Sequence, residues 1–178
     1  KVAREAVLTW NKMKTVVPDW PDIALHRIST RIPWTIPLEQ FPRTLQADVD
    51  AWCNGLGLSD LFDEDAPVRA CRPVTIDHRR FQIRMMASAI VRSGVPINEI
   101  CNLADLVAPD RFRLGIQYML DREDGEVKEA LFGLASGIKA IARHFVKVGE
   151  DHLNQLRRIC SRLDQRADRY RKKNKDRL

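Results

Sequence analysis

Residues 75–93, TIDHRRFQIRMMASAIVRS, decide which fold this chain can adopt. Their apolar positions recur every three or four residues, which is the spacing of one helix face and not of a strand. Thr75 is a suitable N-cap, and the GVP sequence at 94–96 is a typical helix stop. The apolar face contains Ile76, Ile83, Met86, Ala87 and Ile90. We therefore predict an amphipathic helix over 75–93 that packs on other elements.

The same helical spacing continues on both sides of this stretch. Further helices are predicted over residues 42–56, 98–107, 109–122, 126–147 and 151–163. The helix at 126–147 has an apolar stripe of Leu131, Leu134, Ile138, Ile141 and Phe145. Strand-like alternation and internal repeats are not evident. The sequence thus predicts an all-α fold.

The first 41 residues differ in composition from the rest. A short helix is expected over 3–14, and five prolines then favour an extended arm over 16–42. The N-terminal helix and arm together hold Trp10, Trp20 and Trp34, which we interpret as packing residues more readily than as base-stacking ones. The predicted organisation is an N-terminal helix and arm (1–41), a helical domain (42–165) and a basic linker (166–178).

Charge is unevenly distributed along the 178 residues, whose net charge is +6. Acids dominate 39–65, where Arg43 is the single base, whereas Asp77 is the single acid among the arginines of 69–92. Residues 157–178 hold ten bases and three acids. Two basic stretches favour a polyanionic partner, and a solvated helix face with a frayed tail is the alternative.

The candidate contacts are polar side chains flanking the apolar stripes of two helices and basic residues of the tail. Arginines on a helix can bind phosphate or guanine in the major groove, and a helix N-terminus favours phosphate. A solvated amphipathic helix is the alternative. The predicted DNA-binding residues are Arg72, Thr75, Arg79, Arg80, Arg84, Ser88, Ser136, Lys139, Arg143, Lys147, Lys172 and Lys173.

Sequence signals for other chemistry are weak. Nucleotide-binding glycine motifs and the H-E-x-x-H zinc motif do not occur in the sequence. The acidic run Asp63-Glu64-Asp65 is more typical of a surface loop than of a metal site. We expect no cofactor and no metal, and we interpret the four separated cysteines as reduced thiols, at least two of them buried, in a cytosolic protein.

The N-terminal sequence has neither a starting Met nor the apolar core of a signal peptide. We therefore expect a piece of a longer cytoplasmic protein.

Several segments in order resemble the core-binding domain of bacterial tyrosine recombinases of the phage-integrase type. The resemblance rests on residues 41–52, 72–94, 103–107, 141–147 and 173–178. It implies a SAM-like orthogonal helical bundle that clamps one side of duplex DNA during integration and recombination. It also implies assembly of the full-length protein as a tetramer on DNA, in the bacterial nucleoid.

The resemblance implies that a separate C-terminal domain supplies the arginines, lysine, histidines and tyrosine nucleophile of strand exchange. This chain has no H-x-x-R box, and Tyr118 and Tyr170 do not lie in the family's context. DNA binding is therefore carried over and catalysis is not. The alternatives are a stand-alone helical DNA-binding regulator and a helical protein-interaction adaptor.

Overall fold

The computed structural model describes residues 2–25, 33–59 and 69–175, and side chains within 5–167 of these ranges. The described residues are mainly helical and contain no strand, which confirms the predicted all-α class. The chain divides into two compact units, Lys1–Trp34 and Thr35–Leu178.

The first unit is helix α1 (Val2–Val16) with a return segment packed along it. The indole Nε1 of Trp10 donates to the carbonyl of Ile23 at 2.9 Å, and the rings of Trp10 and Trp20 meet edge to face with centroids 4.9 Å apart. Asn11 exchanges two 2.9 Å hydrogen bonds with the backbone of Leu25. The predicted packing role of Trp10 and Trp20 is thus confirmed within this unit.

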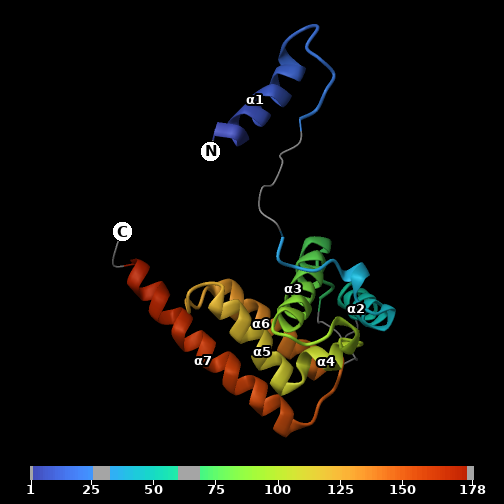
Figure 1. Cartoon of the computed structure of the whole chain (residues 1–178), viewed down its shortest axis with the longest axis vertical. Coiled ribbons are helices and arrows are strands. Elements are labelled where there is room, and N and C mark those ends of the chain that lie inside the picture. Colours follow the sequence, from blue (N-terminus) through green and yellow to red (C-terminus); the bar gives the residue numbers. More distant parts are fainter. Residues whose placement is uncertain (1, 26–32, 60–68, 176–178) are drawn as a thin grey trace. The chain divides into compact units, whose positions relative to one another are not determined.

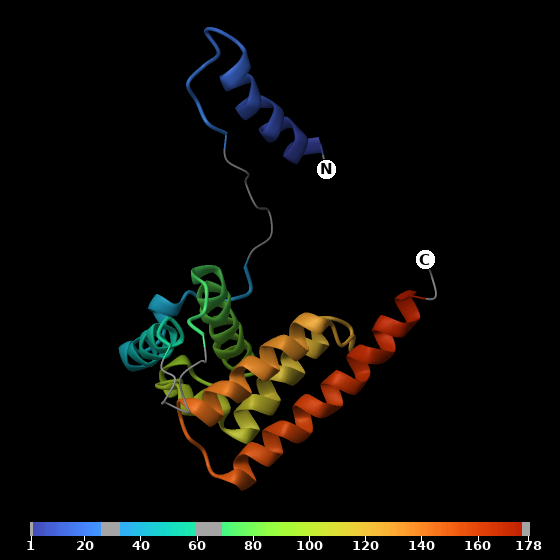
Figure 2. The ribbon, with the colours of Figure 1, turned by 180° about the vertical axis from the view of Figure 1, so that it is seen from behind.

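The second unit is a helical bundle (Figures 1 and 2). Its elements in chain order are η1 (Leu38–Gln40), α2 (Arg43–Leu56), α3 (Pro73–Arg92), η2 (Ile97–Glu99), α4 (Leu103–Val107), α5 (Pro109–Asp121), α6 (Glu129–His144) and α7 (Glu150–Lys175).

Two helix pairs form the framework of the bundle, α3 against α5 and α6 against α7. The α3–α5 contact is close because Gly115 of α5 faces Met86 and Ile90 of α3, both fully buried. The predicted stripe of α6 lies in the core, where Leu131, Leu134, Ile138 and Ile141 are buried and Phe145 is half-buried. Phe145 instead meets the ring of Trp52 of α2, edge to face, at 6.0 Å.

Side chains also fix the short helix α4. Asn102 and Asp105 form a capping box, and Asp48 of α2 accepts a 3.0 Å hydrogen bond from the backbone N–H of Leu103. Arg111 of α5 bridges to Asp105 at 2.9 Å. These bonds hold a five-residue helix that would be too short to persist alone.

Several predicted boundaries are corrected. Helix α3 begins at Pro73 with Arg72 as its N-cap, so Thr75 lies inside the first turn, because proline suits the first helical position. Helix α7 continues to Lys175 although we expected its end near Leu163, because the apolar spacing continues to the buried Ala167 and Arg and Lys favour helix.

The predicted arm also ends earlier than expected. Residues 35–41 belong to the bundle, where the backbone N–H of Ile36 bonds to Ser88 and the ring of Phe41 is buried.

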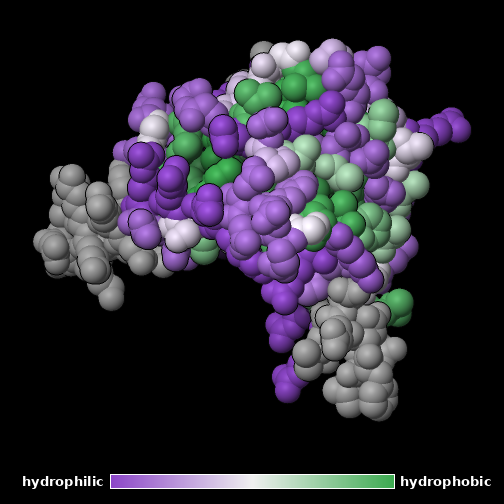
Figure 3. Space-filling model, turned by 90° about the horizontal axis from the view of Figure 1, so that it is seen from below, coloured by the Kyte–Doolittle hydropathy of each residue, from purple (hydrophilic) through white to green (hydrophobic). Residues whose placement is uncertain are grey.

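Hydrophilic and apolar side chains share the face of the molecule drawn in Figure 3. On the face in Figure 3, apolar side chains gather in patches bordered by hydrophilic ones. None of the helices in the described parts of the chain combines the length and apolar composition needed to cross a lipid bilayer.

Candidate nucleic-acid interface

The start of α3 presents exposed positive charge at a helix N-terminus. Arg72 is exposed and precedes Pro73, and the first turn of the helix contains no acidic residue. Backbone N–H groups of a first turn lack helical partners and favour anions. Thr75 is half-buried in this turn. The geometry thus keeps Arg72 and Thr75 together, with Arg72 the more accessible.

Arg79 is the candidate that lies at the contact between α3 and α6. Its Nη1 donates to Oε1 of Gln82 at 2.8 Å. A Cβ added at Gly137 of α6 would lie 2.7 Å from this Nη1 and 2.9 Å from the Gln82 oxygen. Both polar groups therefore occupy space that Gly137 leaves open, and Arg79 lies directly against α6.

The candidates on α6 lie around the part of the helix next to this contact. Ser136 is half-buried and adjoins Gly137, and Arg143 is exposed in the last turn. Lys139 is half-buried, and its charge acts on the Cys160 thiol of α7, so it lies on the side of α6 facing α7. The three side chains therefore extend from the α3 contact toward α7.

Arg80 has an acidic partner. Its Nη1 lies 2.6 Å from Oδ1 of Asp50 on α2, and this hydrogen bond raises the pKa of Arg80. The arginine and aspartate side chains are 39% and 58% exposed, so water still reaches the pair. The pair connects α2 to α3 and leaves Arg80 with compensated charge, which makes it a weaker candidate for DNA than Arg79.

Arg84 is held against an aromatic ring. Its Cζ lies 5.0 Å from the ring centroid of Phe81, a cation–π distance, and Phe81 is 42% exposed. Among the described residues, the buried Nε of Arg84 finds no hydrogen-bond partner. The arginine is thus half-buried, and we retain it as a candidate with a fixed orientation.

The prediction that Ser88 contacts DNA is wrong. Ser88 is fully buried, its Oγ accepts from the backbone N–H of Ile36 at 2.8 Å, and it donates to the carbonyl of Arg84 at 2.7 Å. The prediction treated this flank of α3 as open, but residues preceding α2 cover it. Ser88 holds that segment in place and has no surface to offer DNA.

Lys147 lies beyond α6, which ends at His144, three residues before the predicted end. It is exposed and has a left-handed backbone with φ 57°. The helix ends because the chain turns toward α7, with the N–H groups of Phe145 and Val146 both bonded to the carbonyl of Ile141 at 3.0 Å. Lys147 therefore does not continue the row formed by Ser136, Lys139 and Arg143.

The remaining predictions lie partly outside what is described. Lys172 and Lys173 belong to α7, but their side chains are outside the described set, as is the whole run Asp63-Glu64-Asp65. Among the described residues there is no group of three or more His, Cys, Asp or Glu side chains placed to bind a metal.

The prediction that at least two of the four cysteines are buried is confirmed. Cys53 and Cys160 are buried, and Cys71 and Cys101 are half-buried. Loss of hydration raises the pKa of the Cys53 and Cys160 thiols, which keeps both protonated and unreactive near neutral pH.

Two features of the site were not predicted. Gly133 and Gly137 face α3 from the same side of α6, and Gln82 is buried between the helices. The G-x-x-x-G spacing on α6 was the available signal, since small residues four apart permit a close helix approach.

Comparison of the chain with protein families, with curated proteins and with solved structures finds no match.

Proposed function

We propose that α3 and α6 together form a surface that binds double-stranded DNA. The observation that supports this most directly is the position of Arg79 and Gln82 of α3 against Gly137 of α6. It puts the basic first half of α3 beside the polar face of α6. Two adjoining basic helices can contact phosphates on both sides of a groove.

The charge pattern supports a polyanion over a protein partner. Arg72, Arg79 and Arg84 lie on α3 or at its N-cap, and Lys139 and Arg143 lie on α6. The first turn of α3 has no acid to oppose an incoming phosphate. Arg80 contributes less because it is paired with Asp50.

The finer proposal is the function of a SAM-like core-binding domain in a bacterial tyrosine recombinase. In it, this bundle binds one side of the recombination site, a further domain supplies the nucleophile, and the full-length protein assembles as a tetramer on DNA in the nucleoid. Its support is the ordered sequence resemblance together with the all-helical fold.

The test is fluorescence anisotropy of labelled mixed-sequence duplex DNA against salt concentration. We expect Arg79→Ala, Arg84→Ala and Arg143→Ala each to weaken binding, by about 1–3 kcal/mol for a base contact. Loss of a phosphate contact should reduce the steepness of log affinity plotted against log salt concentration by about 1. Arg158→Ala is the matched control, since Arg158 is an exposed arginine of α7 outside this surface.

Thermal melts of all four variants separate binding from folding. Equal affinity of the three variants and the wild type would refute the two-helix surface. If Arg158→Ala lost as much DNA affinity as the other three variants, the loss would reflect the lower net charge and not a specific surface. Salt-insensitive or undetectable DNA binding would favour the helical adaptor instead.

A further inference from the structure

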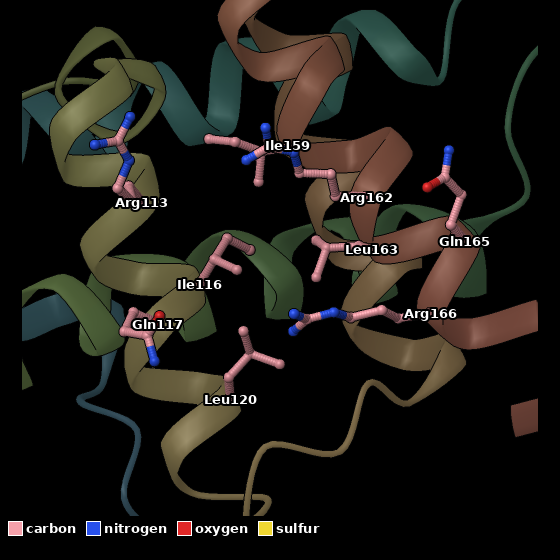
Figure 4. Close-up of a pocket in the computed structure, with 9 residues that line it drawn as sticks. All are labelled: Arg113, Ile116, Gln117, Leu120, Ile159, Arg162, Leu163, Gln165 and Arg166. Atoms are coloured by element: carbon pink, nitrogen blue, oxygen red, sulfur yellow. The ribbon is translucent and has the colours of Figure 1, made fainter. Parts of the chain in front are cut away.

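A groove between α5 and α7 has not been used by the proposed DNA surface. It has a volume of about 390 Å³ and is lined by residues of these two helices alone. Figure 4 looks into it and shows Ile116 and Leu120 on α5 opposite Leu163 on α7. Ile116 and Leu163 are each 4% exposed and form the apolar base of the groove. Leu120 and Ile159 are half-buried and supply its accessible apolar surface.

The border of this groove carries positive charge. Arg113 comes from α5, and Arg162 and Arg166 come from α7, all three exposed. Arg166 extends from α7 toward α5 in Figure 4. None of the described residues that line the groove is acidic. The nearby Asp121 accepts a 2.7 Å hydrogen bond from the amide of Gln117.

We propose that this α5–α7 groove docks an acidic amphipathic helix of a partner protein. Apolar side chains of such a helix would cover the half-buried Leu120 and Ile159, and its carboxylates would pair with the three arginines. Recognition of an amphipathic helix by a groove between two helices uses regularly spaced apolar anchors, and arginine binds carboxylates in a bidentate geometry.

The apolar lining distinguishes this groove from a second DNA site. A phosphate backbone could pair with Arg113, Arg162 and Arg166 but would leave the half-buried Leu120 and Ile159 in contact with water. Only a ligand that is both apolar and anionic can cover the apolar lining and pair with the arginines at the same time. The groove also shares no lining residue with α3 or α6.

The probe is a fluorescein-labelled synthetic helix with leucines on one face and glutamates on both flanks, titrated with the whole chain. A peptide of the same pattern with lysine replacing glutamate is the charge control. We expect Arg162→Gln and Arg166→Gln each to lower the affinity for the acidic peptide about fivefold to tenfold, because each removes a charge-assisted hydrogen bond. Ile159→Asp, which alters the apolar lining of the groove, should lower it at least as much.

Arg158→Gln removes the same charge from α7 outside the groove and should leave peptide affinity unchanged. Arg79→Ala should lower the affinity for duplex DNA but not the affinity for the peptide. Failure of the DNA proposal can therefore be told apart from failure of the docking proposal. Equal binding of the two peptides, displacement of the peptide by duplex DNA, or no binding would overturn the docking proposal. Self-association abolished by Arg162→Gln would overturn it too, by identifying a second copy as the occupant.

Discussion

Arg79 of α3 lies against the bare Cα of Gly137 on α6, with its Nη1 only 2.7 Å from where a Cβ at that position would lie. The same guanidinium donates to Gln82, which is 5% exposed. The position of the central basic residue of the proposed surface therefore depends on a missing side chain on the neighbouring helix.

Gly137→Ala should separate DNA binding from stability. The added methyl group displaces Arg79 and Gln82 and removes a hydrogen bond worth about 0.5–1.5 kcal/mol. Alanine in a helix interior recovers about 0.8–1 kcal/mol relative to glycine. We expect the free energy of unfolding to stay within about 1 kcal/mol of the wild type while DNA affinity falls severalfold, measured by urea unfolding and anisotropy.

Gly133→Ala is the control for this variant. Its Cβ would approach only Nε2 of Gln82, at 4.0 Å, so it adds helix propensity without moving Arg79. DNA affinity should stay at the wild-type level. Loss of affinity in both variants, or in neither, would contradict the role given to Gly137.

Gly115→Ala should destabilise the bundle at the α3–α5 contact. A Cβ there would lie 2.6 Å from the Met86 sulfur and 3.2 Å from Cγ1 of Ile90. Both residues are fully buried, so neither can move into solvent. Overpacking of about 1–3 kcal/mol should outweigh the gain in helix propensity. Urea unfolding at constant m-value measures the net loss, and a more stable variant would show that the contact can relax.

Ser88→Ala should lower stability and leave DNA binding intact. It removes the acceptor of the Ile36 N–H, and an unpaired, partly buried donor costs about 1–3 kcal/mol. Ser161→Ala, at an exposed position of α7, should change stability by no more than about 0.5 kcal/mol. A specific loss of DNA affinity in folded Ser88→Ala would restore Ser88 to the interface.

Lys147→Gly should give a more stable turn between α6 and α7 than Lys147→Ala. Lys147 has φ 57°, a left-handed conformation that costs a residue with a Cβ about 1–2 kcal/mol. Glycine removes this cost but has more freedom in the unfolded chain, so we expect Lys147→Gly to be more stable than Lys147→Ala by about 0.5–1 kcal/mol. Lys147→Ala removes the same side chain and keeps the strain. Equal melting temperatures of the two variants would exclude the backbone explanation.

Apolar periodicity predicted most of the long helices, but the single helix predicted over 98–107 is wrong, because the structure has η2 (Ile97–Glu99) and α4 (Leu103–Val107) there. Residues 109–122 were predicted as a helix, and α5 spans Pro109–Asp121 because proline suits a first turn. Side-chain exposure was harder to predict. A helical wheel places Ser88 beside the apolar face, but it does not show that residues before α2 cover that flank.

The pairing of Arg80 with Asp50 and the position of Arg79 on Gly137 depend on which helices meet. Periodicity within one helix carries no such information. The candidate surface was therefore predictable as two basic helices, and its geometry was not.

The buried thiols predict a loss of stability at alkaline pH. Burial raises the pKa of Cys53 and Cys160 in the folded chain above the ordinary value of 9.0. Their contribution to stability is fully present below the unfolded pKa and is lost as the pH rises through the folded pKa, because only the unfolded chain ionises them easily. The free energy of unfolding should therefore decline as the pH rises above about 9.

Cys53→Ala/Cys160→Ala isolates this contribution from that of other alkaline groups. The variant is expected to be less stable at neutral pH because it loses buried volume, but its stability should decline less steeply above about pH 9. Urea unfolding from neutral pH to about pH 10 gives the slopes for the wild type and this variant. Parallel curves for the wild type and the Cys53/Cys160 variant would show that the two buried thiols do not cause the decline.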